Sequence, residues 1–164
     1  MKSLKNTFAI LGLTILAFSC GKDDIPTTTP TPTFDYFLKA KVNAVSYDAT
    51  DAQTNATKIG SGATTTMTIN SAVGGKSFKF TLIGTPTTRT FPLDSNSSNG
   101  DMSYVESSLN YSTLICPENS GTLIITAVSN TEIAGTFNFT AKSSTICSDA
   151  AKIITDGSFK IKFI

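Results

Sequence analysis

Histidine and tryptophan are missing from this chain of 164 residues, and only 15% of its residues carry a charge. Histidine is the side chain that most often serves as a general base or binds a metal in an active site. Its absence removes the most common route to a hydrolytic or metal-dependent site, so we expect no enzymatic activity, no metal and no cofactor. The basic residues form no cluster, which argues against nucleic acid as a partner.

The chain also lacks an apolar run long enough to span a bilayer, which takes about 20 residues. Its most apolar segment, residues 8–18 (FAILGLTILAF), follows Lys2 and Lys5 and ends at Ser19 and Cys20. A basic start, a short apolar segment and small residues at a cleavage point are typical of a secretory signal peptide. We therefore predict that residues 1–19 are removed on export.

Cys20 indicates which kind of signal peptide this is. Residues 17–20 (AFSC) resemble the lipobox cut by lipoprotein signal peptidase, although that motif usually has an aliphatic residue in place of Ala17 and a smaller one than Phe18. The prediction is a lipoprotein with lipid on Cys20; an ordinary signal peptide beside an unrelated cysteine is the alternative. One acyl chain binds a membrane only marginally, whereas two or three give stable attachment.

Residues 20–33 are predicted to form a tether. Lys22, Asp23 and Asp24 resemble the export signal that sends Bacteroidetes lipoproteins to the outer face of the outer membrane, with a solvated spacer as the alternative. Residues 25–33 (IPTTTPTPT) follow, and proline favours an extended chain. At about 3.1 Å per residue, the tether would hold the next domain up to roughly 40 Å from the membrane.

From residue 34 to residue 164, apolar residues recur at every second position, and no segment keeps a helical period over three turns. Such alternation is typical of antiparallel strands with one buried face. We predict one all-β domain, an antiparallel β-sandwich or a flattened β-barrel of about eight to ten strands. The clearest alternating sets are Leu38, Ala40 and Val42; Met67 and Ile69; Phe78, Phe80 and Leu82; and Phe159, Ile161 and Phe163.

Cys116 and Cys147 are predicted to form a disulfide, as paired cysteines of exported proteins often do. Residues 121–128 and 133–141 suggest a hairpin. A register with Leu123 opposite Phe139 places the two cysteines almost opposite each other, beyond the strands. Two free thiols or a thiol-based site are the alternatives, and the lack of histidine and of CxxC spacing disfavours a catalytic cysteine.

Two further groups of residues suggest ligand sites. Residues 94–101, with Asp94 and Asp101 at their ends, are rich in the oxygen ligands that calcium prefers, but the spacing departs from known calcium loops and a solvated loop is the alternative. Four aromatic residues offer a platform for sugar or protein, although packing in an edge strand or in the core is the more common fate of such residues. They are Phe37, Tyr47, Tyr104 and Tyr111.

Five segments are similar to a family of uncharacterised Bacteroidetes lipoproteins that carry a domain of unknown function. They span nearly all of residues 34–164, and Ala44 and Tyr47 stand where that family usually has Gly and Trp. The resemblance implies an all-β lipoprotein at the surface or facing the periplasm, and it implies no activity. The segments are residues 41–47 (KVNAVSY), 90–93 (TFPL), 120–126 (SGTLIIT), 133–141 (IAGTFNFTA) and 154–163 (ITDGSFKIKF).

These observations predict a lipid-anchored β-domain lipoprotein of the outer membrane, facing the cell exterior, with a non-enzymatic binding or envelope-structural role. Its partners would be the membrane, through Cys20, and an unidentified protein or glycan ligand. An accessory subunit of a nutrient-capture or adhesion complex is the alternative. A hydrolase that uses carboxylates is a weaker one, because the acidic residues are scattered singly.

Overall fold

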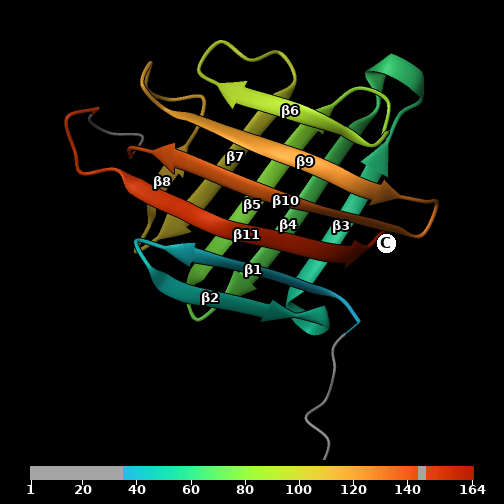
Figure 1. The fold of residues 1–164 in the computed structure, drawn as a ribbon, viewed down its shortest axis with the longest axis horizontal. Coiled ribbons are helices and arrows are strands. Elements are labelled where there is room, and N and C mark those ends of the chain that lie inside the picture. Colours follow the sequence, from blue (N-terminus) through green and yellow to red (C-terminus); the bar gives the residue numbers. More distant parts are fainter. Residues whose placement is uncertain (1–34, 144–146) are drawn as a thin grey trace, which may run out of the picture. The chain divides into compact units, whose positions relative to one another are not determined.

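The computed structural model describes residues 35–143 and 147–164, which form an all-β domain of two antiparallel sheets (Figure 1). The predicted signal peptide, Cys20, the charged residues Lys22, Asp23 and Asp24, and the rest of the tether lie outside the described residues. Within the described part there is no α-helix, and no helix there has the length and apolarity needed to cross a membrane.

The first sheet has six strands, and Figure 1 shows them crossing those of the second sheet at a steep angle. In spatial order they are β2 (Val45–Thr50), β1 (Phe37–Val42), β11 (Lys152–Lys162), β10 (Glu132–Ala141), β9 (Ser120–Val128) and β6 (Arg89–Asp94). The second sheet has five strands: β3 (Thr54–Ile59), β4 (Thr66–Val73), β5 (Lys76–Ile83), β7 (Gly100–Glu106) and β8 (Leu109–Ser112). Two short 3-10 turns, η1 (Asp51–Gln53) and η2 (Gly62–Thr64), flank β3.

The all-β prediction is confirmed. Of the two predicted architectures, the domain is a sandwich and not a closed barrel, because each sheet keeps its own edge strands. Two isolated bridges, Ala56 to Phe163 and Tyr111 to Ser143, connect strands of the second sheet to the residues that follow β11 and β10, without closing the sheets into a barrel. The described residues form eleven strands, whereas about eight to ten were predicted. The shortest of them is β8. The turn before β8 places Ser107 and Ser108 at positive φ (52° and 66°), where glycine or asparagine is the usual signal for a hairpin.

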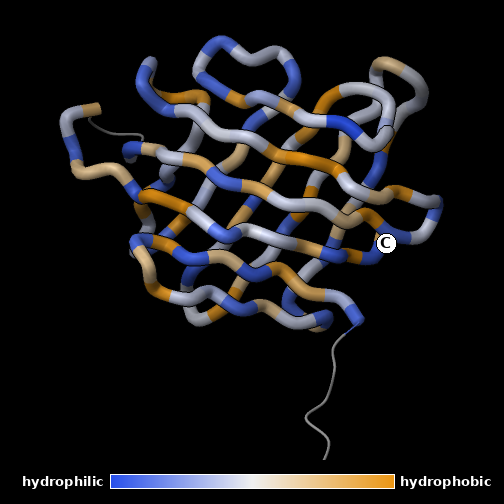
Figure 2. The backbone as a smooth tube through the Cα atoms, viewed as in Figure 1, coloured by the Kyte–Doolittle hydropathy of each residue, from blue (hydrophilic) through white to orange (hydrophobic). Residues whose placement is uncertain are grey.

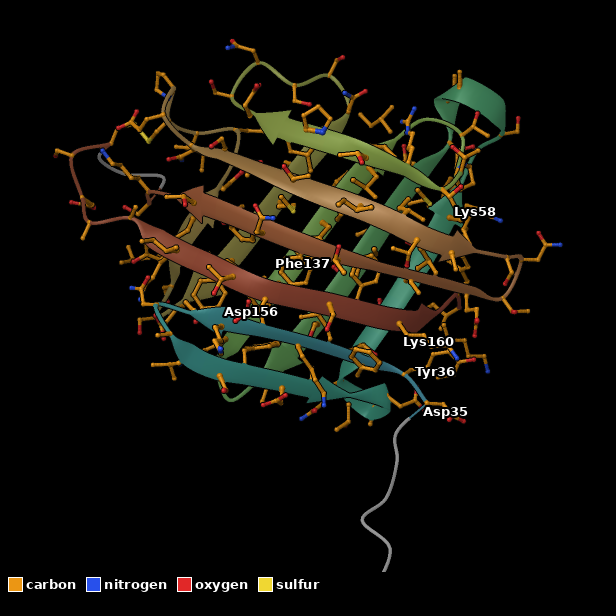
Figure 3. All side chains as sticks on the ribbon, viewed as in Figure 1. Asp35, Tyr36, Lys58, Phe137, Asp156 and Lys160 are labelled. Atoms are coloured by element: carbon orange, nitrogen blue, oxygen red, sulfur yellow. A yellow bond between two sulfur atoms is a disulfide. The ribbon has the colours of Figure 1, made fainter. Side chains whose placement is uncertain are left out.

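The core lies between the two sheets, and alternation along the strands builds it. Figure 2 shows apolar and polar residues alternating along most strands. Aromatic rings fill the centre: the Phe137 ring, labelled in Figure 3, lies 4.7 Å from that of Phe80 and 5.6 Å from that of Phe78. Offset and edge-to-face contacts of this kind add to the stabilisation that comes from burial.

The predicted register of the β9–β10 hairpin is wrong by two residues. Leu123 lies opposite Phe137, and Phe139 lies opposite Gly121. The small glycine makes room for Phe139, since a Cβ atom at Gly121 would lie 2.4 Å from the Cβ of that phenylalanine. A shift of two residues keeps every side chain on its predicted face, whereas a shift of one would reverse the faces.

The predicted disulfide between Cys116 and Cys147 is confirmed, with 5.6 Å between the two Cα atoms. It lies outside the strand ladder, which ends at Ser120 opposite Thr140. Buried Asn119 organises this end of the domain: its Nδ2 donates to the Ser112 carbonyl at 2.8 Å, and its Oδ1 accepts from the Lys142 amide at 3.0 Å. Side-chain hydrogen bonds therefore bring together the loops that the disulfide joins.

Candidate functional site

The outer face of the five-stranded sheet carries short polar side chains. Because Met67, Phe80 and their inward neighbours fill the core, the alternate positions of these strands face outward. One row crosses the sheet at successive paired positions, from β3 through β4 and β5 to β7. It consists of Asn55, Asn70, Lys79 and Ser103.

A second row beside the first completes a shallow groove of about 530 Å³. This row holds Ala72, Ser77, Val105 and Asn110, paired in that order across β4, β5, β7 and β8. Gln53, at the end of η1, lies at the margin, where its Oε1 accepts from the Thr50 amide at 2.9 Å. We call this depression, lined by both rows and Gln53, the sheet groove.

Hydrogen bonding inside the sheet groove is incomplete. Asn70 Nδ2 donates to Asn55 Oδ1 at 3.1 Å, and Ser103 Oγ donates to the Lys79 carbonyl at 3.1 Å. Asn110 Oδ1 is shielded from solvent, yet it has no hydrogen-bond partner among the described residues. A shielded acceptor without a donor costs about 1–3 kcal/mol, and a ligand in the groove would reach this one only after the Asn110 side chain rotated outward.

The sheet groove has little charge. Among the described residues that line it there is no Asp or Glu, and Lys79 is the one charged side chain. Asp101 lies opposite Thr81, outside the residues that line the groove. Burial raises the pKa of Asp101, while the Thr81 hydroxyl and Lys79 act in the opposite direction. The groove thus presents amides, hydroxyls and one ammonium group beside the apolar side chains of Ala72 and Val105.

A separate charged cluster joins the two sheets at one end of the sandwich. Glu106 on β7 accepts hydrogen bonds from Lys76 on β5 and from Lys152, the first residue of β11. Hydrogen bonds from Lys152 and Lys76 lower the pKa of Glu106 to about 2. All three charged groups take part in ion pairs, one between neighbouring strands and one between the two sheets. The role of the cluster is therefore structural.

The oxygen-rich segment 94–101 is organised by its own hydrogen bonds. Asp94 Oδ1 accepts from the Asn96 amide at 2.8 Å, and Ser97 Oγ donates to the Pro92 carbonyl at 3.2 Å. Asp101, at the far end of the segment, belongs to strand β7. Within residues 35–143 and 147–164, no three His, Cys, Asp or Glu side chains gather closely enough to hold a metal ion.

Core packing, the more common fate expected for the four aromatic residues, is confirmed for three of them. Tyr47, Tyr104 and Tyr111 are only 5%, 0% and 8% exposed, because they face the core between the sheets. Phe37 is half-buried, and the Lys39 ammonium lies 5.6 Å from the centre of its ring.

Lysines also cover other aromatic rings near the start of β1. Lys160 lies 5.5 Å from the Tyr36 ring, and both are labelled in Figure 3 beside Asp35. Lys58 similarly lies 5.2 Å from the Phe163 ring. In these contacts a lysine of the domain itself covers the face of each ring. We therefore propose no ligand site at these rings.

Sequence reasoning missed the sheet groove because its residues come from five strands and carry no motif. Asn55, Asn70 and Asn110 each lie at an outward position of a strand, where a polar residue is expected in any sandwich. The available signal was composition: amides and hydroxyls recur at these positions, where long charged side chains are also common. Recognising a site required the pairing of the strands.

The domain matches a known family. A family model with the description "Domain of unknown function (DUF6252)" covers residues 35–161, a range that takes in nearly the whole of both sheets. No match was found among curated proteins or among solved structures. Because the matched range is most of the chain, this protein belongs to the DUF6252 family, which is defined by a domain of unknown function.

Proposed function

We propose that this protein is a lipid-anchored lipoprotein of the outer membrane of a Bacteroidetes bacterium, facing the cell exterior, and that it binds a polar ligand without catalysis. The observation that carries the binding role is the sheet groove, whose described lining holds one ammonium group and no carboxylate, together with the unpartnered Asn110 Oδ1. The weaker hydrolase alternative requires two carboxylates in one cleft. The described residues that line the groove include none.

The proposed location is supported by the order of features at the N-terminus. A signal-like segment ends at Cys20, a charged stretch follows at Lys22, Asp23 and Asp24, and a Pro/Thr tract leads to the domain. Acyl chains on Cys20 would hold the protein to the bilayer, and an extended tether would keep the groove accessible to large ligands outside the cell.

Protease shaving of intact cells tests the location. We expect the wild-type chain to be digested on intact cells, and the triple variant Lys22→Ala/Asp23→Ala/Asp24→Ala to be protected until the outer membrane is broken. Alanine at threonines 27–29 of the same tether is the matched control and should stay accessible. A wild-type chain that resists protease on intact cells would contradict surface exposure.

A second measurement concerns the anchor and the partner. Cys20→Ala should abolish incorporation of labelled palmitate and release the protein from the membrane fraction. Purification of the wild-type protein from detergent-solubilised membranes should yield it without a stoichiometric partner. Recovery of such a partner would instead favour an accessory subunit of a nutrient-capture or adhesion complex.

A further inference from the structure

We infer that the sheet groove binds a linear, uncharged oligosaccharide that lies across the strands of the five-stranded sheet. This inference rests on the proposed binding function and names the chemical class of the ligand. Its observations are the shape of the groove, the chemistry of its lining and the unpartnered Asn110 Oδ1.

The groove is elongated, and we call its long direction across the strands the track. Its lining residues come from all five strands and from the adjoining turn η1. Neighbouring strands lie about 4.8 Å apart, so the track is about 19 Å long from β3 to β8. Apart from Lys79, the side chains along its middle are short, as at Ala72, Ser77 and Ser103, and they leave an open trough for an extended chain.

The lining suits hydroxyl groups. A carboxamide offers two donors and an acceptor, and a sugar hydroxyl also donates and accepts, so the two can exchange hydrogen bonds in pairs. Asn55, Asn70 and Asn110 supply three such amides from three different strands. Once the Asn110 side chain rotates towards the groove, its unpartnered Oδ1 can accept a hydrogen bond from a sugar hydroxyl.

The charge of the lining favours an uncharged glycan. Lys79 forms no ion pair among the described residues, but it is a single cation, and Asp101 lies near enough to lower the local potential. A polyanionic chain would need several cations along the track. One ammonium is instead suited to donating hydrogen bonds to hydroxyl or ring oxygens.

A peptide fits this face less well. Extended peptides are usually bound by adding a strand to a sheet edge, and the backbone groups of β4, β5 and β7 already pair with strands on both sides. The groove also lacks an open apolar pocket for side chains, because Phe78 beneath it is only 1% exposed. The same burial removes aromatic stacking, so each site should bind weakly, and many copies on one membrane would supply avidity.

The test uses the full-length lipoprotein in detergent and saturation-transfer NMR. The probes are maltohexaose, cellohexaose, xylohexaose and chitohexaose, with oligogalacturonate as the anionic comparison. At least one neutral probe should bind, and Asn70→Ala/Asn110→Ala should weaken that binding about ten-fold through the loss of two hydrogen-bonding groups. The matched control is Asn130→Ala, in the exposed turn between β9 and β10, which should bind as the wild type does.

Three results would overturn the inference: no binding of any neutral probe, preferential binding of oligogalacturonate, or binding that the double variant leaves unchanged. Thermal unfolding of each variant shows whether the fold is intact. If the double variant unfolds early, Ser77→Gln, which adds bulk to the trough at an outward position, should block the same probe. Protease shaving reports on surface location independently, so failure of the glycan inference can be told apart from failure of the proposed location.

Discussion

Glu106 is the residue through which the two sheets are joined electrostatically. Its carboxylate lies between the ammonium groups of Lys76, on the neighbouring strand, and Lys152, on the other sheet. The side chain is 23% exposed, so the ion pairs are only partly screened by solvent. Their hydrogen bonds hold the pKa of Glu106 at about 2, below the ordinary value of 4.5.

The lowered pKa predicts a pH-dependent loss of stability. A carboxyl group whose pKa falls on folding stabilises the protein above its unfolded pKa, and that contribution is lost as the pH drops from about 4.5 towards 2. Urea unfolding at pH 7 should show Glu106→Gln to be less stable than the wild type by about 1–2 kcal/mol. As the pH falls towards 2 the difference should shrink to a small part of that value; a difference that is the same at both pH values would contradict this role.

Strands β10 and β11 are matched by two reciprocal pairs of glycine and phenylalanine. Gly135 lies opposite Phe159, and Phe137 lies opposite Gly157. A Cβ atom at Gly135 would lie 2.2 Å from the Ile124 carbonyl oxygen and 2.7 Å from the Phe159 ring. Each phenylalanine therefore covers a glycine on the neighbouring strand, an arrangement that stabilises strand pairs. This pairing explains both the GTF and the DGSF segments of the sequence.

Alanine at position 135 is expected to destabilise the domain by about 1–3 kcal/mol, because backbone and ring must move to admit a methyl group. Chemical denaturation measures this. The neighbouring Thr136→Ala is the control, since Thr136 is exposed on the outer face, and it should change stability by less than about 0.5 kcal/mol. Equal effects of the two substitutions would show that the close contact at Gly135 is not what limits packing.

At the scale of the whole molecule, the disulfide is expected to be the largest single constraint on the unfolded chain. Cys116 and Cys147 are 31 residues apart in sequence, and closing a loop of that size contributes roughly 3–4 kcal/mol on the chain-entropy account. Cys116→Ala/Cys147→Ala should lower the free energy of unfolding by about that amount, with the strands still formed by circular dichroism. The wild-type protein should resist alkylation at both positions until it is reduced, and immediate alkylation would contradict the bond.

Much of the fold follows from local pattern. The buried faces of β1, β4, β5 and β11 were all predicted correctly, because successive side chains of a strand point to opposite sides whatever the partner strand is. The turn at Asn43 and Ala44 adopts positive φ (47° and 67°), as a two-residue hairpin requires. The pairing of the two cysteines was also predictable, since it needs only that two chain ends leave a hairpin on the same side.

The remaining features depend on contacts between distant segments. The hairpin register was decided by the space that Gly121 leaves for Phe139, and the burial of Tyr104 by a second sheet that no local pattern reveals. The sheet groove arises only when five strands align Asn70, Asn110 and their neighbours. Faces are a property of one strand, whereas registers, grooves and shielded acceptors are properties of strand pairs and layers, and they exist only in the folded chain.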